Sequence, residues 1–159
     1  GYTAKLAGTE TGMGDEPEAT FSTCFGAPFL PLAPGVYADM LGQRLDRHGS
    51  RVYLVNTGWV GGPYGVGSRI SISYTRAMVD AAITGRLDGV AWRTDPVFGI
   101  EVPAECPGVP PELLDQRSNW ASPAEYDHRA RELADRFIRN FAQFKDVPKE
   151  ISQAGPRPG

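Results

Sequence analysis

The sequence has few of the residue patterns that build metal or disulfide frameworks. Its 159 residues include two cysteines, Cys24 and Cys106, which lie far apart and show no CxxC or Cys/His ligand spacing. This spacing argues against a zinc site and predicts two reduced cysteines in a reducing compartment.

Long apolar runs and a strong excess of one charge are also missing. No stretch approaches the run of about 18 apolar residues that a membrane helix needs, and the N-terminal residues lack a secretory signal pattern. The formal net charge of −3 gives no reason to expect nucleic acid or an anionic membrane as a partner. We expect a cytoplasmic protein with one domain. Because the chain begins with Gly1 rather than Met, we also expect a fragment, although processing or tag removal exposes a glycine too.

Catalytic motifs are scarce as well. The two histidines, His48 and His128, fall on predicted helices, where His48 suits a capping role at the helix end and His128 a solvated face. The sequence contains neither a serine nucleophile elbow nor a GxxxxGK[ST] phosphate loop. The residues alone therefore identify no catalytic machinery.

The most informative stretch runs from Tyr53 to Arg76. Residues 51–56 (RVYLVN) are mostly β-branched or aromatic, which predicts a strand covered on both faces. A glycine-rich loop (GGPYGVGSR) occupies residues 61–69, and a helix is predicted at about 74–84. Because α/β proteins place ligands where a strand passes through a loop into a helix, this stretch is predicted to bind a nucleotide.

Two interpretations of the loop remain open. Glycines permit close approach of the backbone to a ligand, but a tight solvent-exposed loop needs them as well. Arg69 favours a site, since a planar cation can stack on a base or pair with ribose and phosphate oxygens. Thr75 either adds a hydroxyl contact or merely caps the helix. Ser73 is the predicted N-cap, and Gly85 is predicted to lie just beyond the end of the helix.

The remaining elements favour an α/β fold over an all-β fold. Residues 34–48 show the apolar spacing of one helical face, and Gly49 follows as a stop. Ser122 and Glu125 form a capping box that begins another helix, whose aromatic stripe predicts core packing. That stripe consists of Tyr126, Ala130, Leu133, Phe137, Phe141 and Phe144. Loop is predicted at 1–20, an irregular or edge strand at 21–32, and a connection with one or two short strands at 87–111.

A family resemblance rests on five segments: GYTAKLAGTE (1–10), TFSTCFGAPFL (20–30), YLVNTGW (53–59), GGPYGVGSRISISYTR (61–76) and PVFGIEVPAECPGVP (96–110). In this order they resemble the C-terminal part of ATP-dependent phosphoenolpyruvate carboxykinase. The resemblance implies an α/β fold, with a mixed sheet and flanking helices, that forms part of the C-terminal nucleotide-binding domain. It divides the chain into a lid-like loop at 1–14, an α/β body at 15–146 and a tail at 147–159.

The resemblance also implies a function. The family converts oxaloacetate and ATP to phosphoenolpyruvate, carbon dioxide and ADP in gluconeogenesis, with Mg2+ and usually Mn2+ as cofactors. Arg69, Ile70 and Thr75 match the adenosine side of the ATP site, and Lys5 and Thr9 match the lid. No residue matches the family's phosphate loop, metal ligands or substrate arginines, which are implied to lie upstream. The implied partners are ATP, oxaloacetate and the upstream part of the same chain.

One departure and one alternative accompany this interpretation. Some family members have a shorter glycine loop and a Lys-Asp pair where this chain has Ser73 and Tyr74, which we interpret as subfamily variation. The alternative is a free-standing, non-catalytic nucleotide-binding or interaction module derived from the enzyme. The reading frame upstream of Gly1 distinguishes the two, because only the enzyme encodes the phosphate loop and metal ligands there.

The resemblance predicts weak ATP binding by the 159-residue segment alone. Most affinity for the phosphates would come from the upstream loop, lysine and metal ions, so the segment should also be catalytically inactive by itself. Isothermal titration calorimetry with ATP checks this expectation. A submicromolar dissociation constant for the isolated segment would contradict it.

Overall fold

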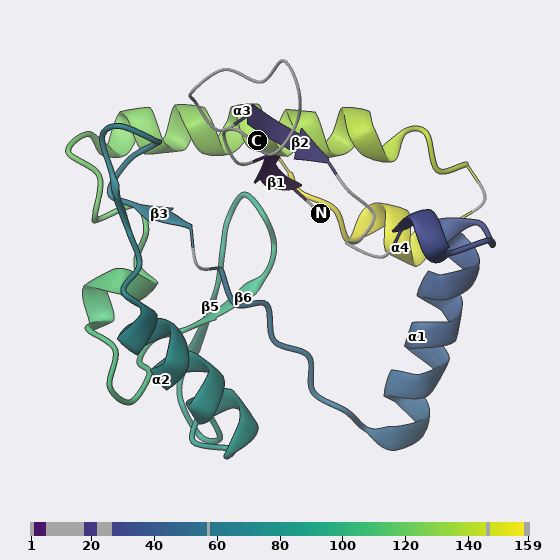
Figure 1. Cartoon of the computed structure of the whole chain (residues 1–159), viewed down its shortest axis with the longest axis horizontal. Helices are drawn as coiled ribbons and strands as arrows, with labels where there is room; N and C mark the ends of the chain where they lie inside the picture. The colour runs from purple at the N-terminus through teal and green to yellow at the C-terminus, as the bar shows by residue number, and fades with distance from the viewer. Residues whose placement is uncertain (1, 6–17, 22–26, 57, 146, 158–159) are drawn as a thin grey trace. The chain divides into compact units, whose positions relative to one another are not determined.

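The computed structural model describes residues 2–5, 18–21, 27–56, 58–145 and 147–157. The chain divides into two compact units. The first comprises Gly1–Arg51 and Arg139–Ser152, and the second comprises Val52–Ile138 and Gln153–Gly159. Figure 1 shows the elements of both. The predicted site residues Arg69, Ile70 and Thr75 all belong to the second unit.

The first unit contains a short antiparallel pair and two helices. Strand β1 (Tyr2–Lys5) pairs with β2 (Glu18–Phe21), so that Tyr2 lies opposite Phe21. The prediction of loop throughout 1–20 is therefore wrong at both ends. Strands of four residues are too short to show a reliable alternation of apolar and polar residues. The 3-10 helix η1 (Ala27–Phe29) follows within the segment predicted to be irregular.

Helix α1 (Pro34–His48) has the predicted bounds. Gly49 adopts the left-handed conformation, with φ of 59°, and its N–H donates to the Leu45 carbonyl, which is the predicted C-terminal stop. No residue of α1 is buried. The short helix α4 (Lys149–Gln153) lies within the predicted tail.

The second unit begins with a segment whose prediction is wrong. Residues 51–56 belong to none of the three two-stranded sheets that the described residues form. Val52 is 62% exposed and Leu54 is 84% exposed, although the sequence predicted a strand covered on both faces. A strand exists only where a neighbouring strand accepts its backbone hydrogen bonds, and local sequence does not show whether that neighbour is present.

Helix α2 (Ile72–Ile83) follows two short strands, β3 (Trp59–Val60) and β4 (Ser68–Arg69). Its N-cap is Ser71, whose side chain accepts a hydrogen bond from the Ser73 N–H at 3.3 Å. The prediction of Ser73 as the cap is therefore wrong by two residues. Both serines satisfy the cap preference, and the backbone geometry decides between them.

The end of α2 agrees with the prediction. Gly85 lies just past the helix with φ of 72°, and the Arg86 N–H donates to the Ala81 carbonyl at 3.0 Å. This turn returns the chain toward α2, and Leu87 is buried directly after it.

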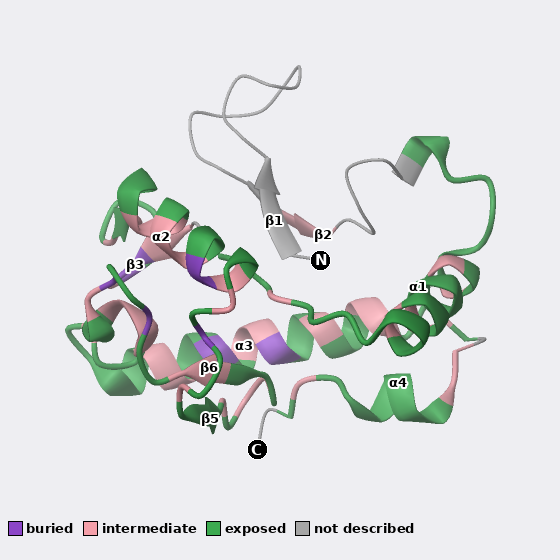
Figure 2. Ribbon diagram, turned by 90° about the horizontal axis from the view of Figure 1, so that it is seen from below, coloured by how far each residue is buried: buried purple, intermediate pink, exposed green. Residues whose placement is uncertain are grey.

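A small core packs against α2. Ala81, Leu87, Cys106 and Val109 are buried and form one cluster, and buried positions are purple in Figure 2. Tyr74 and Met78 of α2 are partly buried against the same cluster. Cys106 is a free thiol, and burial raises its pKa while the nearby Arg86 guanidinium partly offsets the shift. Cys24 lies outside the described residues.

The rest of the second unit connects this core to a long helix. Strand β5 (Trp92–Thr94) pairs antiparallel with β6 (Glu101–Pro103), as expected for the segment predicted to hold one or two short strands. The 3-10 helix η2 (Pro111–Leu114) precedes α3 (Pro123–Phe141), which continues into the first unit.

The start of α3 confirms half of the predicted capping box. The Glu125 N–H donates to the Ser122 hydroxyl at 3.3 Å, and Pro123 is the first helical residue. The Glu125 carboxylate instead accepts from Arg129 one turn later, at 3.0 Å. The aromatic stripe lies on the less exposed face, where Ala130 and Ala134 are buried.

The described residues thus form an α/β structure of helices and small antiparallel pairs. They contain no parallel pairing and no larger mixed sheet. None of the helices in the described part of the chain combines the length and apolar character needed to cross a membrane.

The core predicts a packing effect at Ala81, which is fully buried. Ala81→Leu should lower the free energy of unfolding by about 1–3 kcal/mol, because the added methylenes have no space beside Leu87 and Cys106. Ala38→Leu on the exposed surface of α1 is the matched control and should change it by less than about 0.5 kcal/mol. Chemical denaturation of the protein expressed from its complete reading frame measures both, and equal effects would contradict the packing argument.

Candidate functional site

The candidate site is built on a β-hairpin that leads into α2. Strands β3 and β4 are antiparallel, with Trp59 opposite Arg69 and Val60 opposite Ser68. The glycine-rich loop between them turns at Pro63, whose carbonyl accepts from the N–H of Val66 at 3.1 Å and of Gly67 at 2.9 Å. The glycine-rich loop is therefore the tip of a hairpin. Its two strands place the large side chains of Trp59 and Arg69 at paired positions.

The hairpin itself explains the glycines. A side chain at Gly67 would collide with the Gly62 carbonyl and lie 2.6 Å from the Val60 carbonyl. Gly61 and Gly65 have φ of 78° and 83°, which other L-residues rarely adopt. This geometry explains the glycines without a ligand. Only the side chains around the loop therefore indicate a binding site.

Arg69 stacks on an aromatic ring. Its guanidinium carbon lies 5.1 Å from the centre of the Trp59 ring, within the range of a cation–π interaction. Tyr64, at the tip of the loop, contacts Trp59 edge to face, with 5.7 Å between the ring centres and an interplanar angle of 67°. Trp59 is half-buried, whereas Arg69 and Tyr64 are exposed. The hairpin therefore presents a cation, held against an aromatic face, to solvent.

Ile70 and Thr75 lie between this hairpin and the body of α2. The Ile70 N–H donates to the Gly58 carbonyl at 3.1 Å, which ties the end of β4 back to the start of β3. The Thr75 hydroxyl donates to the Ser71 carbonyl at 3.3 Å, so its proton is used within the first turn of α2. Its oxygen can still accept a hydrogen bond. Arg69, Ile70 and Thr75 are therefore gathered around the N-terminus of one helix.

Of these three residues only Ile70 lines a groove of about 970 Å³, whereas Arg69 and Thr75 do not contribute to its lining. Trp59 and Ile70 line it at the hairpin, and Leu54, Met78 and Phe98 line its apolar wall. This volume is within the range of small-molecule sites. Part of the wall is the exposed segment around Leu54.

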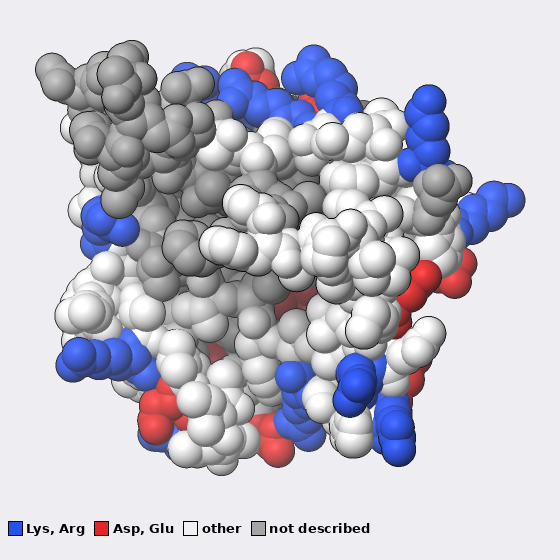
Figure 3. Space-filling view, turned by 45° about the vertical axis from the view of Figure 1, so that its right-hand side comes forward, with Lys and Arg blue, Asp and Glu red and all other residues white. Residues whose placement is uncertain are grey.

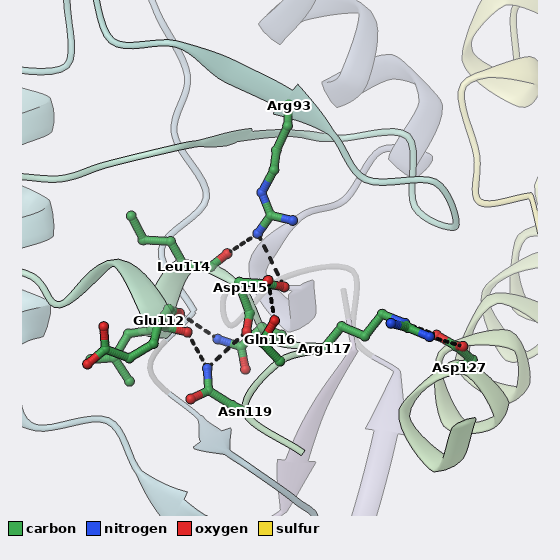
Figure 4. Close-up of polar contacts among 10 residues, drawn as sticks. Arg93, Glu112, Leu114, Asp115, Gln116, Arg117, Asn119 and Asp127 are labelled. Carbon is green, nitrogen blue, oxygen red and sulfur yellow. Dashed lines mark hydrogen bonds and ion pairs between the residues drawn. The ribbon is translucent and has the colours of Figure 1, made fainter. Parts of the chain in front are cut away.

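A polar network lies along another part of the groove (Figure 4). Arg93 of β5 donates to the Leu114 carbonyl at 2.5 Å and forms an ion pair with Asp115 at 3.7 Å. The Asn119 amide donates to the carbonyls of Glu112 and Asp115. These bonds join β5 to the turn that follows η2.

The same network lowers the pKa of two carboxyl groups. The Ser118 hydroxyl donates to Asp115 and, together with the Arg93 charge, holds the pKa of Asp115 below its ordinary value. Arg117 donates two hydrogen bonds to Asp127 of α3, at 2.8 and 2.9 Å, and this pairing lowers the pKa of Asp127. Since every member has a partner within the protein, the network serves to connect β5, η2 and α3.

Of the two predicted lid residues, Lys5 and Thr9, only the backbone of Lys5 is described. Lys5 is the last residue of β1, opposite Glu18, and its side chain is not among those described. Thr9 lies outside the described residues. The lid assignment therefore stays a prediction.

Two further features of the described part of the chain are its metal-ligating residue types and its surface charge. Within the described ranges, no group of three or more His, Cys, Asp or Glu side chains is arranged to hold a metal ion. Figure 3 shows acidic and basic side chains interspersed around the face that it displays.

Sequence reasoning missed two residues of the candidate site. Trp59 and Tyr64 were not among the predicted site residues. In the sequence, Trp59 and Arg69 lie at equal distances on either side of Tyr64. A hairpin with its turn near Tyr64 would have placed them opposite each other. The pairing of Arg93 with Asp115 had no comparable signal, because it joins residues from separate elements.

Comparison with known proteins decides the family. A family model described as "Phosphoenolpyruvate carboxykinase" matches residues 1–112. "Phosphoenolpyruvate carboxykinase (ATP) 2" of Moorella thermoacetica is 63% identical over 156 residues, which are 98% of this chain and 30% of that protein. This chain belongs to the ATP-dependent phosphoenolpyruvate carboxykinase family. The resemblance seen in the sequence is therefore confirmed.

Other carboxykinases of the family give the same picture. "Phosphoenolpyruvate carboxykinase (ATP)" of Thermus thermophilus is 59% identical over 158 residues, covering 99% of this chain and 30% of that protein. The corresponding protein of Caldanaerobacter subterraneus is 58% identical over 157 residues, with the same shares covered. The chain thus spans about 30% of the length of the carboxykinases that it matches.

The polar network predicts how stability depends on pH. Because the pKa of Asp115 is lowered on folding, its contribution is present above the pKa of the unfolded state and is lost as pH falls through the folded value. Asp115→Asn removes this contribution, so the variant should lose less stability than the parent between about pH 4 and pH 2.

Thermal unfolding across this pH range measures the effect. Asp39→Asn on the exposed surface of α1 is the control for the loss of one carboxylate. If both variants lose less stability than the parent at low pH, and by the same amount, net charge rather than the contacts of Asp115 would account for the loss of stability in acid.

Proposed function

We propose that this chain is the C-terminal portion of an enzyme that converts oxaloacetate and ATP to phosphoenolpyruvate, carbon dioxide and ADP. In this role it contributes the adenosine side of the ATP site and the lid. The observation that carries the proposal is the position of Arg69, which is exposed at the N-terminus of α2 and stacked on Trp59. Membership of the carboxykinase family supports this reaction. We propose that it serves gluconeogenesis in the cytoplasm.

Each proposed contact matches a chemical part of adenosine. The Arg69 guanidinium can stack on the base or donate to ribose and phosphate oxygens. Ile70 is half-buried and lines the groove, so it offers an apolar edge to the base. Thr75 offers an acceptor oxygen while its proton remains bonded to Ser71. Together they can bind the nucleotide without taking part in the chemistry.

The charge-stabilising groups lie elsewhere in this proposal. Transfer of a phosphoryl group requires cations positioned on the phosphates, usually a lysine and divalent metal ions. The described residues do not fit such a metal site, since they hold no suitable cluster of ligands. Following the family resemblance, we propose that the ligands of Mg2+ and Mn2+ lie upstream of this chain. The metal ions would supply charge stabilisation there, and the isolated segment would be inactive.

The upstream part also completes the fold. Residues 51–56 have the composition of a strand buried on both faces, yet Leu54 is exposed and borders an open groove. We propose that strands from the remaining length of the protein form the mixed sheet and cover this segment. That sheet and its flanking helices would form the nucleotide-binding domain, which fits the share of about 30% that this chain covers.

The segment 1–14 is proposed as a lid that closes over bound nucleotide. Lys5 would approach the phosphates, and Thr9 would add a hydroxyl contact in the closed state. The motion would exclude water from the reacting groups, which strengthens electrostatic interactions there.

Substitution of Arg69 tests the adenosine assignment. In the enzyme expressed from its complete reading frame, Arg69→Ala should raise the Michaelis constant for ATP about tenfold or more. A lost stacked, charge-assisted contact is worth about 1.5–3 kcal/mol. The Michaelis constant for oxaloacetate should change little, because its site is formed upstream. Steady-state kinetics with each substrate varied in turn measure both constants.

Arg44→Ala on the exposed surface of α1 is the control for loss of one positive charge, and it should leave both constants unchanged. An unchanged constant for ATP in Arg69→Ala would overturn the assignment. Equal increases for ATP and oxaloacetate would show a general structural defect instead.

A further inference from the structure

The hairpin fixes the direction of the Arg69 side chain through Trp59. The two residues face each other across β3 and β4, so their side chains leave the hairpin from adjacent strands on the same side. The guanidinium carbon lies 5.1 Å from the centre of the indole ring. Among the described residues, Arg69 forms no ion pair that would hold it elsewhere, so the indole is its main lateral support.

The indole is itself supported. Trp59 is half-buried, its neighbour Val60 is buried at 8% exposure, and the Ile70 N–H closes the base of the hairpin on Gly58. Tyr64 packs its edge against the Trp59 ring at 5.7 Å. The turn at Pro63 brings Tyr64 to this position, and the close approach at Gly67 keeps the loop tight. The glycine loop of this chain, which is longer than in some family members, therefore places Tyr64 in supporting contact with Trp59.

The guanidinium carbon lies over the indole ring, and the Arg69 side chain is otherwise exposed to solvent. A free arginine side chain loses rotamer freedom when it binds a ligand, and this loss weakens binding. Stacking on Trp59 restricts the rotamers before the ligand arrives. The guanidinium edge and its other face are then already placed to meet a nucleotide.

We propose that Trp59, buttressed by Tyr64, is a positioning residue that preorganises Arg69 for the adenosine part of ATP. The inference rests on the proposed function, since it concerns how the adenosine contact is prepared. Trp59 acts through Arg69 and need not touch the nucleotide itself. Its effect is therefore predicted to disappear when the Arg69 guanidinium is absent.

A double-mutant cycle in the complete enzyme tests this dependence. Trp59→Leu keeps an apolar side chain but removes the π face, and it should raise the Michaelis constant for ATP about two- to fivefold. The turnover number and the constant for oxaloacetate should stay within about twofold of the parent, because the chemistry is performed elsewhere. In the Arg69→Ala background, the same substitution should produce no further increase.

Trp59→Phe is the conservative variant and the safeguard if Trp59→Leu expresses poorly. Phenylalanine keeps an aromatic face but binds cations less strongly than tryptophan, so the increase should be smaller than in Trp59→Leu. Its effect should also vanish in the Arg69→Ala background. Equal increases of the Michaelis constant for ATP in the Phe and Leu variants would overturn the inference. The size of the side chain, rather than its π face, would then explain the effect of Trp59.

The adenosine assignment of Arg69 and the positioning role of Trp59 are distinguished by different kinetic outcomes. If Arg69→Ala raises the constant for ATP while Trp59→Leu and Trp59→Phe do not, the adenosine assignment stands and the positioning role is overturned. If Trp59→Leu raises the constant equally with and without Arg69, Trp59 acts independently of the guanidinium, which also overturns the inference. If Arg69→Ala itself has no effect, the proposed function fails first.

Discussion

The packing of α2 against the turn at 106–109 is the contact on which the candidate site depends. Ala81 is fully buried in this contact, with Cys106 and Val109 opposite it in the same cluster. The first turn of α2 carries Thr75, and Arg69 and Ile70 precede the N-cap residue Ser71. Because a helix moves as a rigid element, fixing one face of α2 fixes the position of Thr75, whereas the hairpin directs Arg69. The site therefore depends on the packing of α2 for Thr75 and on the hairpin for Arg69.

This arrangement changes the meaning of the glycine-rich loop. In phosphate-binding loops, glycines allow backbone N–H groups to surround an anion. Here the glycines serve a hairpin turn, since Gly67 is required by the nearby Val60 and Gly62 carbonyls. The loop instead brings Tyr64 against Trp59, which supports Arg69. The chemistry of the stretch thus belongs to side chains at the base of the hairpin, which suits a nucleoside better than a phosphate chain.

Local sequence was sufficient where local physics decides the structure. The apolar spacing and Gly49 predicted α1, and the Ser122 cap with Pro123 predicted the start of α3. It failed at residues 51–56, because a strand requires a partner and none is among the described residues. It also chose Ser73 over Ser71, since both residues can cap a helix and only the chain path distinguishes them.

For the site, the sequence indicated Arg69 as a candidate through its chemistry, and the family resemblance supplied Ile70 and Thr75. Trp59 was missed because its role depends on the register of a two-residue strand pair. A crystal structure of the complete protein with a non-hydrolysable ATP analogue and Mg2+ tests the central claim most directly. The account predicts the adenine or ribose in van der Waals contact with the Arg69 guanidinium, with Ile70 at its edge. A nucleotide bound elsewhere, with Arg69 stacked on Trp59 and facing only solvent, would contradict it.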